Sequence, residues 1–175
     1  MVGVGLRLAV IGATLFLSVG VAVGARTGNP PAGTFSGSYK VTFKITNVKS
    51  KPVHWIWHAK PTCASLCRTL SFRQRLVSEK AWEKAVVTFR WNGKAYAQTV
   101  MYRRYTDCRT KSGATVKKGY DVKTSEQLRT HTVVNGRVVK WVGSRRDDYI
   151  PNAAGRKHHC ATGGAYIYTV NAVSQ

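Results

Sequence analysis

The sequence predicts an all-β protein, built as a single antiparallel up-and-down β-barrel of about eight or nine strands. Three observations support this fold class. Apolar and polar side chains alternate along most of the chain, Asn-Gly pairs separate alternating runs, and strands do not alternate with helices. Long strands in simple hairpin succession favour a barrel, because closure removes exposed strand edges. A β-sandwich is the alternative.

The first 25 residues predict export from the cytoplasm. Residues 8–25 carry no charge, follow Arg7, and end with the small residues Val23 and Ala25, which is typical of a signal peptide cleaved after Ala25. The charge-free run has 18 residues, the short end for a membrane-spanning helix, so an uncleaved anchor is the alternative. In both cases we expect the rest of the chain outside the cytoplasm, secreted or at the cell surface.

A linker and then the first strand follow the leader. Residues 26–37 are rich in Gly, Pro, Ser and Thr, which predicts a flexible linker, and residues 38–175 are expected to form the barrel domain. Tyr39, Val41 and Phe43 lie on one face of the first strand, opposite Lys and Thr residues. This period of two is typical of a half-buried strand. The same alternation recurs over residues 53–60, 69–73 and 84–91.

Two Asn-Gly pairs predict hairpins. Asn92-Gly93 and Asn135-Gly136 each stand between two alternating runs. A type I′ turn needs positive φ at both central residues, and Asn-Gly meets that need best. The joined runs span residues 84–91 and 94–105 at the first pair, and 127–134 and 137–142 at the second.

Outside these hairpins the sequence predicts one more strand and little helix. Residues 165–173 alternate, with Tyr166, Tyr168 and Val170 on one face. The only helix candidate is a short turn around residues 78–84. The chain after the leader is therefore expected to consist almost wholly of strands and turns.

The cysteines predict two disulfides. All four follow the leader: Cys63, Cys67, Cys108 and Cys160. An even number in an exported chain indicates disulfides, and three connectivities are possible. We favour Cys63–Cys67 as a local loop and Cys108–Cys160 as a long-range bridge, which would contribute roughly 3–4 kcal/mol. A metal site is the alternative, because two histidines precede Cys160, but a second ligand pair with structural-zinc spacing is missing, so no metal is predicted.

One segment resembles a known group of proteins. Residues 57–67 read WHAKPTCASLC and follow a strand that reads GSYKVTFKIT. This segment, the NGR hairpin and the C-terminal cysteine resemble small secreted actinobacterial domains of lipocalin-like architecture, over most of residues 37–174. The resemblance implies a lipocalin-like barrel and export. Such domains are largely uncharacterised, so the resemblance assigns no catalytic residue.

The charge is the main hint about partners. The chain carries a formal net charge of +21, which attracts polyanions such as anionic lipid headgroups or acidic cell-wall polymers. Six cations lie close together in the sequence, opposed only by Asp107, and form the candidate cationic patch: Arg103, Arg104, Arg109, Lys111, Lys117 and Lys118. An evenly solvated surface is the alternative. Tyr102 and Tyr105 interleave with these cations as in single-strand nucleic-acid grooves, but the period of two favours rings in the core, so no nucleic-acid partner is predicted.

Catalytic groups are scarce. The chain has seven Asp and Glu residues, and it lacks a strained nucleophile elbow and a Gly-rich phosphate loop. Asp147 and Asp148 are strand neighbours on opposite faces, and each is expected to pair with Arg145 or Arg146. We therefore predict a non-catalytic binding domain without a cofactor, which engages an anionic surface or holds a small apolar ligand in the barrel. A secreted enzyme with an unrecognised active site is the alternative.

Overall fold

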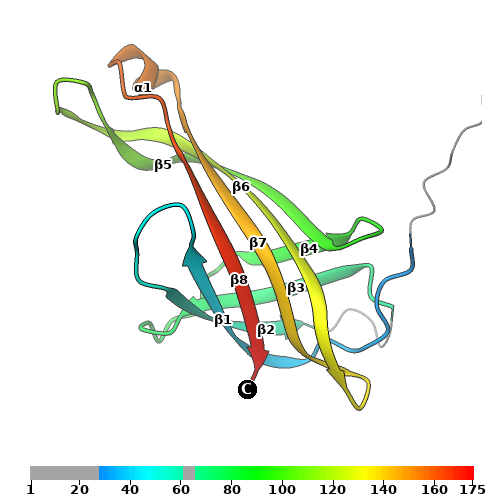
Figure 1. Ribbon diagram of the computed structural model, residues 1–175. Coiled ribbons are helices and arrows are strands. Elements are labelled where there is room, and N and C mark those ends of the chain that lie inside the picture. Colours follow the sequence, from blue (N-terminus) through cyan, green and yellow to red (C-terminus); the bar gives the residue numbers. More distant parts are fainter. Residues whose placement is uncertain (1–27, 61–65) are drawn as a thin grey trace, which may run out of the picture.

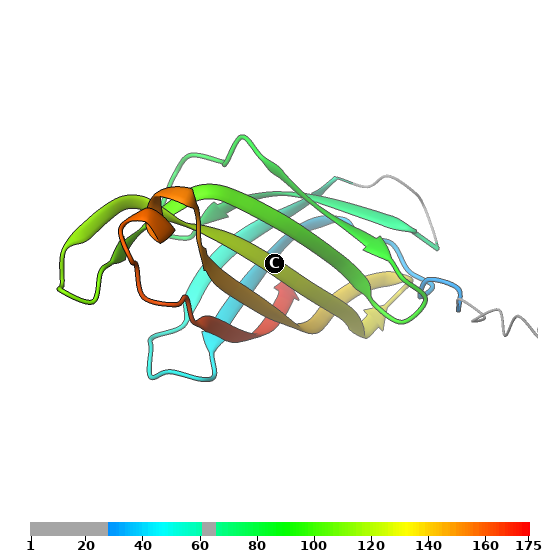
Figure 2. The ribbon, with the colours of Figure 1, turned by 90° about the horizontal axis from the view of Figure 1, so that it is seen from above.

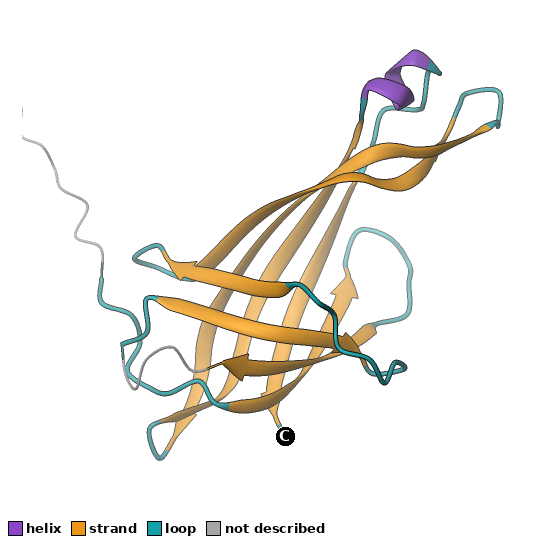
Figure 3. Ribbon diagram, turned by 180° about the vertical axis from the view of Figure 1, so that it is seen from behind, coloured by secondary structure: helices purple, strands orange, loops and turns teal. Residues whose placement is uncertain are grey.

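The computed structural model describes residues 28–60 and 66–175, and in them the chain folds into one closed β-barrel (Figures 1 and 3). In chain order the strands are β1 (Gly37–Ile45), β2 (Val53–Lys60), β3 (Thr69–Leu76), β4 (Val86–Trp91), β5 (Tyr96–Arg109), β6 (Thr115–Val134), β7 (Arg137–Pro151) and β8 (Ala165–Ser174). A short helix, α1 (Ala153–Lys157), lies between β7 and β8. Nothing helical in these ranges has the length and apolar character needed to cross a bilayer.

The strand order confirms the predicted up-and-down barrel. Each strand is antiparallel to the next in the chain, and β1 also pairs with β8, which closes the ring. Tyr39 lies opposite Trp57 in β2 and opposite Ser174 in β8, so the first strand is held on both sides. The sheet therefore forms a barrel and not the alternative sandwich.

Aromatic side chains fill the half of the barrel interior that lies toward the β6–β7 turn. Tyr39, Trp57, Phe72 and Trp141 are each at most 1% exposed. Phe72 lies 4.9 Å from Trp141 and 5.4 Å from Trp57 between ring centroids, and Tyr39 lies 5.2 Å from Trp141. Each such pair adds about 0.5–1.5 kcal/mol to the effect of burial itself. This half of the interior is occupied by the protein's own side chains.

The segment before β1 belongs to the folded domain, although the sequence predicted a linker over residues 26–37. Phe35 is 2% exposed, and its ring lies 5.4 Å from that of Tyr96 and 5.6 Å from that of Trp141. Thr34 forms a β-bridge with Arg137. Burial of one phenyl ring outweighs the turn-forming composition around it, so the domain begins before Ser38.

Three strands continue well beyond the rest of the barrel. β5, β6 and β7 run on past the other strands and carry α1 near their far end (Figures 1 and 2). β4 pairs with β5 only at two positions, Arg90 with Ala97 and Trp91 with Tyr96, and the two strands then diverge. We call this extension the wing and define it as residues 101–123 and 148–165, which face one another in the strand register.

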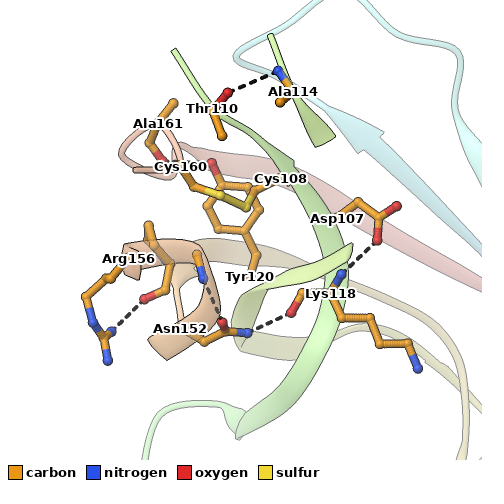
Figure 4. The surroundings of a disulfide bond; sticks show 12 residues. Asp107, Cys108, Thr110, Ala114, Lys118, Tyr120, Asn152, Arg156, Cys160 and Ala161 are labelled. Atoms are coloured by element: carbon orange, nitrogen blue, oxygen red, sulfur yellow. Dashed lines mark hydrogen bonds between the residues drawn. A yellow bond between two sulfur atoms is a disulfide. The ribbon is translucent and has the colours of Figure 1, made fainter. Parts of the chain in front are cut away.

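A disulfide ties the helix to the wing. The predicted Cys108–Cys160 bond is confirmed, and it joins β5 to the residues just after α1 (Figure 4). Gly119 in β6 lies so close to the Cys108 sulfur that any Cβ at this position would clash with it. The other predicted bond, Cys63–Cys67, involves Cys63, which lies outside the described residues, so that bond stays a prediction.

The side chain of Asn152 begins the helix and fixes its position. Its Oδ1 accepts a hydrogen bond from the Gly155 backbone N–H at 3.1 Å, which is the N-cap interaction. Its Nδ2 donates to the Lys118 carbonyl in β6 at 2.8 Å (Figure 4). The helix candidate around residues 78–84 does not form a helix: the chain there forms turns and bends between β3 and β4.

The two Asn-Gly pairs behave differently. Asn135 and Gly136 have φ of +49° and +70°, as the predicted type I′ turn requires. At the other pair only Gly93 has positive φ, and the Asn92 side chain accepts hydrogen bonds from the Lys94 and Ala95 backbone N–H groups. The type I′ prediction is therefore wrong at residue 92, because the Asn side chain closes a longer loop.

Candidate functional site

The wing has two chemically different faces. Met101, Arg103 and Ile150 line a hollow on its outer face, next to α1. Tyr120 and Tyr149 line a hollow on its inner face, toward the mouth of the barrel. Because successive side chains of a strand point to opposite sides, the same strands supply both faces.

All six residues of the candidate cationic patch lie on the β5–β6 hairpin, and all six are exposed. The structure brings only some of them together. Arg103 and Arg104 line the outer hollow together with Arg156 of α1, and this hollow measures about 530 Å³. Lys111 lines a neighbouring hollow of about 660 Å³, which also includes Arg156. Arg156 therefore lies next to Arg103 and Arg104 in one hollow and to Lys111 in the other. It was not among the six residues predicted for the patch.

The remaining patch residues lie elsewhere on the hairpin. Lys117 forms an ion pair with Asp107 at 3.2 Å, and Asp107 belongs to the inner face. The Lys118 backbone N–H donates to Asp107 Oδ1 at 2.8 Å. Arg109 lies beside the disulfide, where its carbonyl accepts a hydrogen bond from the Ala161 N–H. The six cations therefore share one hairpin but do not form one continuous cluster.

Asp121 organises the outer hollow. Its Oδ1 accepts the Arg104 backbone N–H at 2.8 Å, and its Oδ2 accepts Arg103 Nη1 at 2.8 Å. These two bonds, the backbone N–H first, hold the pKa of Asp121 below its usual range, so the group stays ionised. They also hold Arg104 in a left-handed conformation, with φ of +49°, at a bulge in β5. The backbone of Arg104 is therefore held at the bulge, and this fixes the point from which its side chain extends.

A buried polar cluster occupies the barrel interior between the aromatic core and the wing. Arg145 donates two hydrogen bonds to Asp147, Nε to Oδ1 at 2.9 Å and Nη2 to Oδ2 at 3.0 Å. Thr124 donates to Asp147 Oδ1 at 2.7 Å, and Gln98 donates to Glu126 Oε2 at 3.0 Å. One half of the barrel interior is therefore filled by aromatic rings, and the other half by hydrogen-bonded polar and charged side chains.

The sequence analysis found part of this cluster. Each aspartate pairs with one of the two arginines as predicted, Asp147 with Arg145 and Asp148 with Arg146. Glu126 was missed, although it is 2% exposed and lies opposite Arg145 in the register of β6 and β7. Burial raises the pKa of Glu126 to about 7. Its Oε1 atom has no hydrogen-bond partner among the described residues.

The described residues contain no group of three His, Cys, Asp or Glu side chains placed to hold a metal ion. Cys160, the central residue of the alternative metal hypothesis, is bonded to Cys108. A disulfide sulfur cannot act as a thiolate ligand, because the thiolate form is the one that binds metal. The two preceding histidines, His158 and His159, are exposed beside α1.

No protein-family model matches this chain, and no curated protein or solved structure matches it either. The resemblance to secreted actinobacterial domains therefore stays a prediction, and so does the lipocalin-like identity of the barrel.

Proposed function

We propose that the protein is an exported, non-catalytic binding domain that engages an anionic surface through the outer face of its wing. The observation that carries this proposal is the meeting of Arg103, Arg104 and Arg156 around one hollow. Two of these guanidinium groups come from β5 and one from α1, and the Cys108–Cys160 bond fixes the two segments to each other. Preorganised arginines suit phosphate and carboxylate groups, because the planar guanidinium donates two parallel hydrogen bonds.

The charge balance of the hollow supports an anionic ligand. Asp121 is the acid that lines it, and this carboxylate is already satisfied by Arg103 and by the Arg104 backbone. Arg104 and Arg156 therefore keep their charge available to a ligand. Met101 and Ile150 lie in the same hollow, and are 39% and 40% exposed. A lipid headgroup with its adjoining glycerol, or an acidic wall polymer, presents matching anionic and apolar parts.

Location outside the cytoplasm fits this role. The Cys108–Cys160 disulfide is consistent with an oxidising, extracytoplasmic compartment. Export itself rests on the leader, residues 1–25, which lies outside the described residues. An exported domain of this charge would meet anionic headgroups and wall polymers directly.

A small apolar ligand inside the barrel has weaker support. The apolar half of the interior is filled by packed rings, with Phe35 against them. The other half is lined by the charged side chains of Arg145, Asp147 and Glu126. An eight-stranded barrel can be filled by its own side chains, and that description fits this interior best.

Vesicle binding at increasing salt tests the proposal. We expect the protein to bind vesicles with anionic headgroups, or an acidic polymer column, and to bind neutral vesicles much less. The triple variant Arg104→Gln, Lys111→Gln, Arg156→Gln should weaken binding by about 3 kcal/mol, on the order of a hundredfold, because each cation near an anionic surface contributes about 1 kcal/mol.

The matched control removes three exposed cations that lie outside the wing: Arg90→Gln, Lys94→Gln, Arg129→Gln. It lowers the net charge equally and should retain most of the affinity. Equal loss in both triple variants would mean that total charge, and not the wing, drives binding. Binding to the polymer but not to vesicles would identify the wall polymer as the source of the anionic groups.

A further inference from the structure

A second hollow, on the inner face of the wing, has a different chemistry. It measures about 580 Å³, within the range of small-molecule sites. Three tyrosine rings and one carboxylate dominate its wall: Tyr120, Tyr149, Tyr166 and Asp107. Val48, from the loop between β1 and β2, also lines this hollow, and the neighbouring Asn47 is hydrogen-bonded to Ala165 and Ile167 of β8. Four strands and one loop therefore contribute to a single site.

Tyr149 stands at nearly right angles to each of the two neighbouring rings. The plane of Tyr149 makes 88° with that of Tyr120 and 87° with that of Tyr166, with centroids 6.1 Å and 5.3 Å apart. The Tyr120 hydroxyl donates to the Ala161 carbonyl at 2.8 Å, which holds this ring beside the disulfide (Figure 4). In an edge-to-face pair, the ring face that the neighbour does not cover is electron-rich and can attract a cation.

One carboxylate, that of Asp107, lines this hollow, and a second, that of Asp147, is buried nearby. Asp107 is at the rim, and the Lys118 backbone N–H and the Lys117 ammonium lower its pKa, so it stays ionised. Asp147 lies one inward position below Tyr149 in β7 and pairs with Tyr166 of β8 in the register. After burial, the charge of Asp147 is the next cause that raises the pKa of Tyr149.

The local charge balance differs from that of the whole molecule. Lys117 and Arg145 offset Asp107 and Asp147, and Glu126 adds a third carboxyl group below, with one oxygen lacking a partner among the described residues. The Lys117–Asp107 ion pair is exposed to solvent, with the Lys117 side chain 87% exposed, so it contributes little free energy and a ligand ammonium group can replace Lys117. Rings and carboxylates then determine what the hollow prefers.

We infer that the inner hollow of the wing binds an organic ammonium group, with the faces of Tyr149 and Tyr166 against the cation and Asp107 as its counter-charge. Ring faces repel anions, so the anionic ligand of the outer face does not fit here. This inference goes beyond the proposed function and is independent of it, because the two hollows lie on opposite faces of the wing.

Calorimetric titration with choline and with 3,3-dimethylbutan-1-ol tests the inference. The two molecules have nearly the same shape, but only choline carries a positive charge. At about 0.15 M salt we expect choline to bind the full mature chain at least tenfold more tightly than the alcohol. Equal affinities would overturn the inference, since they would mean that shape and apolar contact alone determine binding.

Two pairs of matched variants locate the site. Tyr166 is 37% exposed, so its replacement leaves the aromatic core intact. Tyr166→Leu should lower choline affinity at least tenfold, and Tyr166→Phe, which keeps the ring face, should stay within about threefold of wild type. Asp107→Asn should also weaken binding. Its control, Asp148→Asn, removes an aspartate that is ion-paired with Arg146 and should leave choline affinity unchanged.

Two outcomes with these variants would contradict the inference. If Tyr166→Leu binds choline as tightly as Tyr166→Phe does, the ring face is not part of the site and the inference fails. If Asp148→Asn weakens binding as much as Asp107→Asn, the effect comes from total charge and not from this hollow. The comparison of choline with the alcohol uses the unmodified protein, so it remains decisive if a variant does not fold.

Discussion

Burial makes it costly in free energy to keep the Glu126 carboxyl group ionised. Burial removes its carboxylate from water, and the nearby charge of Asp147 adds to the cost. Arg145 and Gln98 favour the ionised form, but not enough to offset burial, so the pKa rises to about 7. In the unfolded chain the same group has an ordinary pKa of about 4.3. Folding therefore takes up a proton near neutral pH.

This difference predicts how the stability of the barrel depends on pH. Since the folded state binds the proton more tightly, the free energy of unfolding should fall as the pH rises from about 4.3 to 7, and then level off. Glu126→Gln mimics the protonated group. It should be about as stable as wild type at pH 4 and about 3 kcal/mol more stable at pH 8.

Urea unfolding at both pH values measures this effect. Glu79→Gln, which changes an exposed acid outside the barrel interior, is the control and should follow wild type. A Glu126→Gln protein with the wild-type pH dependence would show that the carboxyl is not buried in solution as described.

At this scale the sequence predicts local pairs better than distant ones. Arg145 and Asp147 are two positions apart on one strand, so a period of two already places them on one face. Glu126 meets Arg145 only through the pairing of β6 with β7. The sequence analysis predicted a strand only from residue 127 onward, so it could not place Glu126 opposite Arg145.

The individual elements show how the wing is held together. α1 has only five residues, too few to be stable as an isolated helix. Its stability comes from the Asn152 cap, from the contact of Asn152 with β6, and from the Cys108–Cys160 bond. The outer hollow depends on the same contacts, because Arg156 belongs to this helix.

Removal of the disulfide should therefore act locally as well as on overall stability. We expect the double variant Cys108→Ser, Cys160→Ser to lose about 2–4 kcal/mol of unfolding free energy. Amide hydrogen exchange should accelerate around α1 and the end of β5, while β1–β3 keep their protection at low denaturant. A uniform acceleration over all strands would contradict this expectation.

Strands with an apolar inner face were the ones predicted. β1, β2 and β8 alternate cleanly because their inner residues, such as Phe43, Trp57 and Val170, enter the aromatic core. In the parts of β6 and β7 nearer the wing, the inward-facing residues include Thr124, Glu126 and Arg145. Apolar and polar side chains therefore do not alternate there. A period search for apolar residues cannot detect a strand whose buried side is charged.

Across the whole molecule, the barrel depends on a residue before its first strand. Phe35 packs against Tyr96 and Trp141, so it joins the two sides of the core near the β6–β7 turn. Phe35→Ala should lower the unfolding free energy by about 3–5 kcal/mol, the usual cost of deleting a buried ring. Val48→Ala, at a residue 45% exposed, is the control and should change stability by less than about 0.5 kcal/mol. Thermal or urea unfolding measures both, and equal stabilities would show that Phe35 does not pack in solution.

Closure of the barrel has a consequence for the timing of folding. The pairing of β1 with β8 joins Tyr39 to Ser174, almost the two ends of the described chain. Contacts of such long sequence separation form slowly, because the loop entropy is lost before the pairing is gained. Until β8 pairs with it, β1 has one unpaired edge and an exposed apolar face. Both features favour strand pairing between separate protein molecules, which leads to aggregation. In a growing chain, one edge of β1 therefore stays unpaired until β8, Ala165–Ser174, has been synthesised.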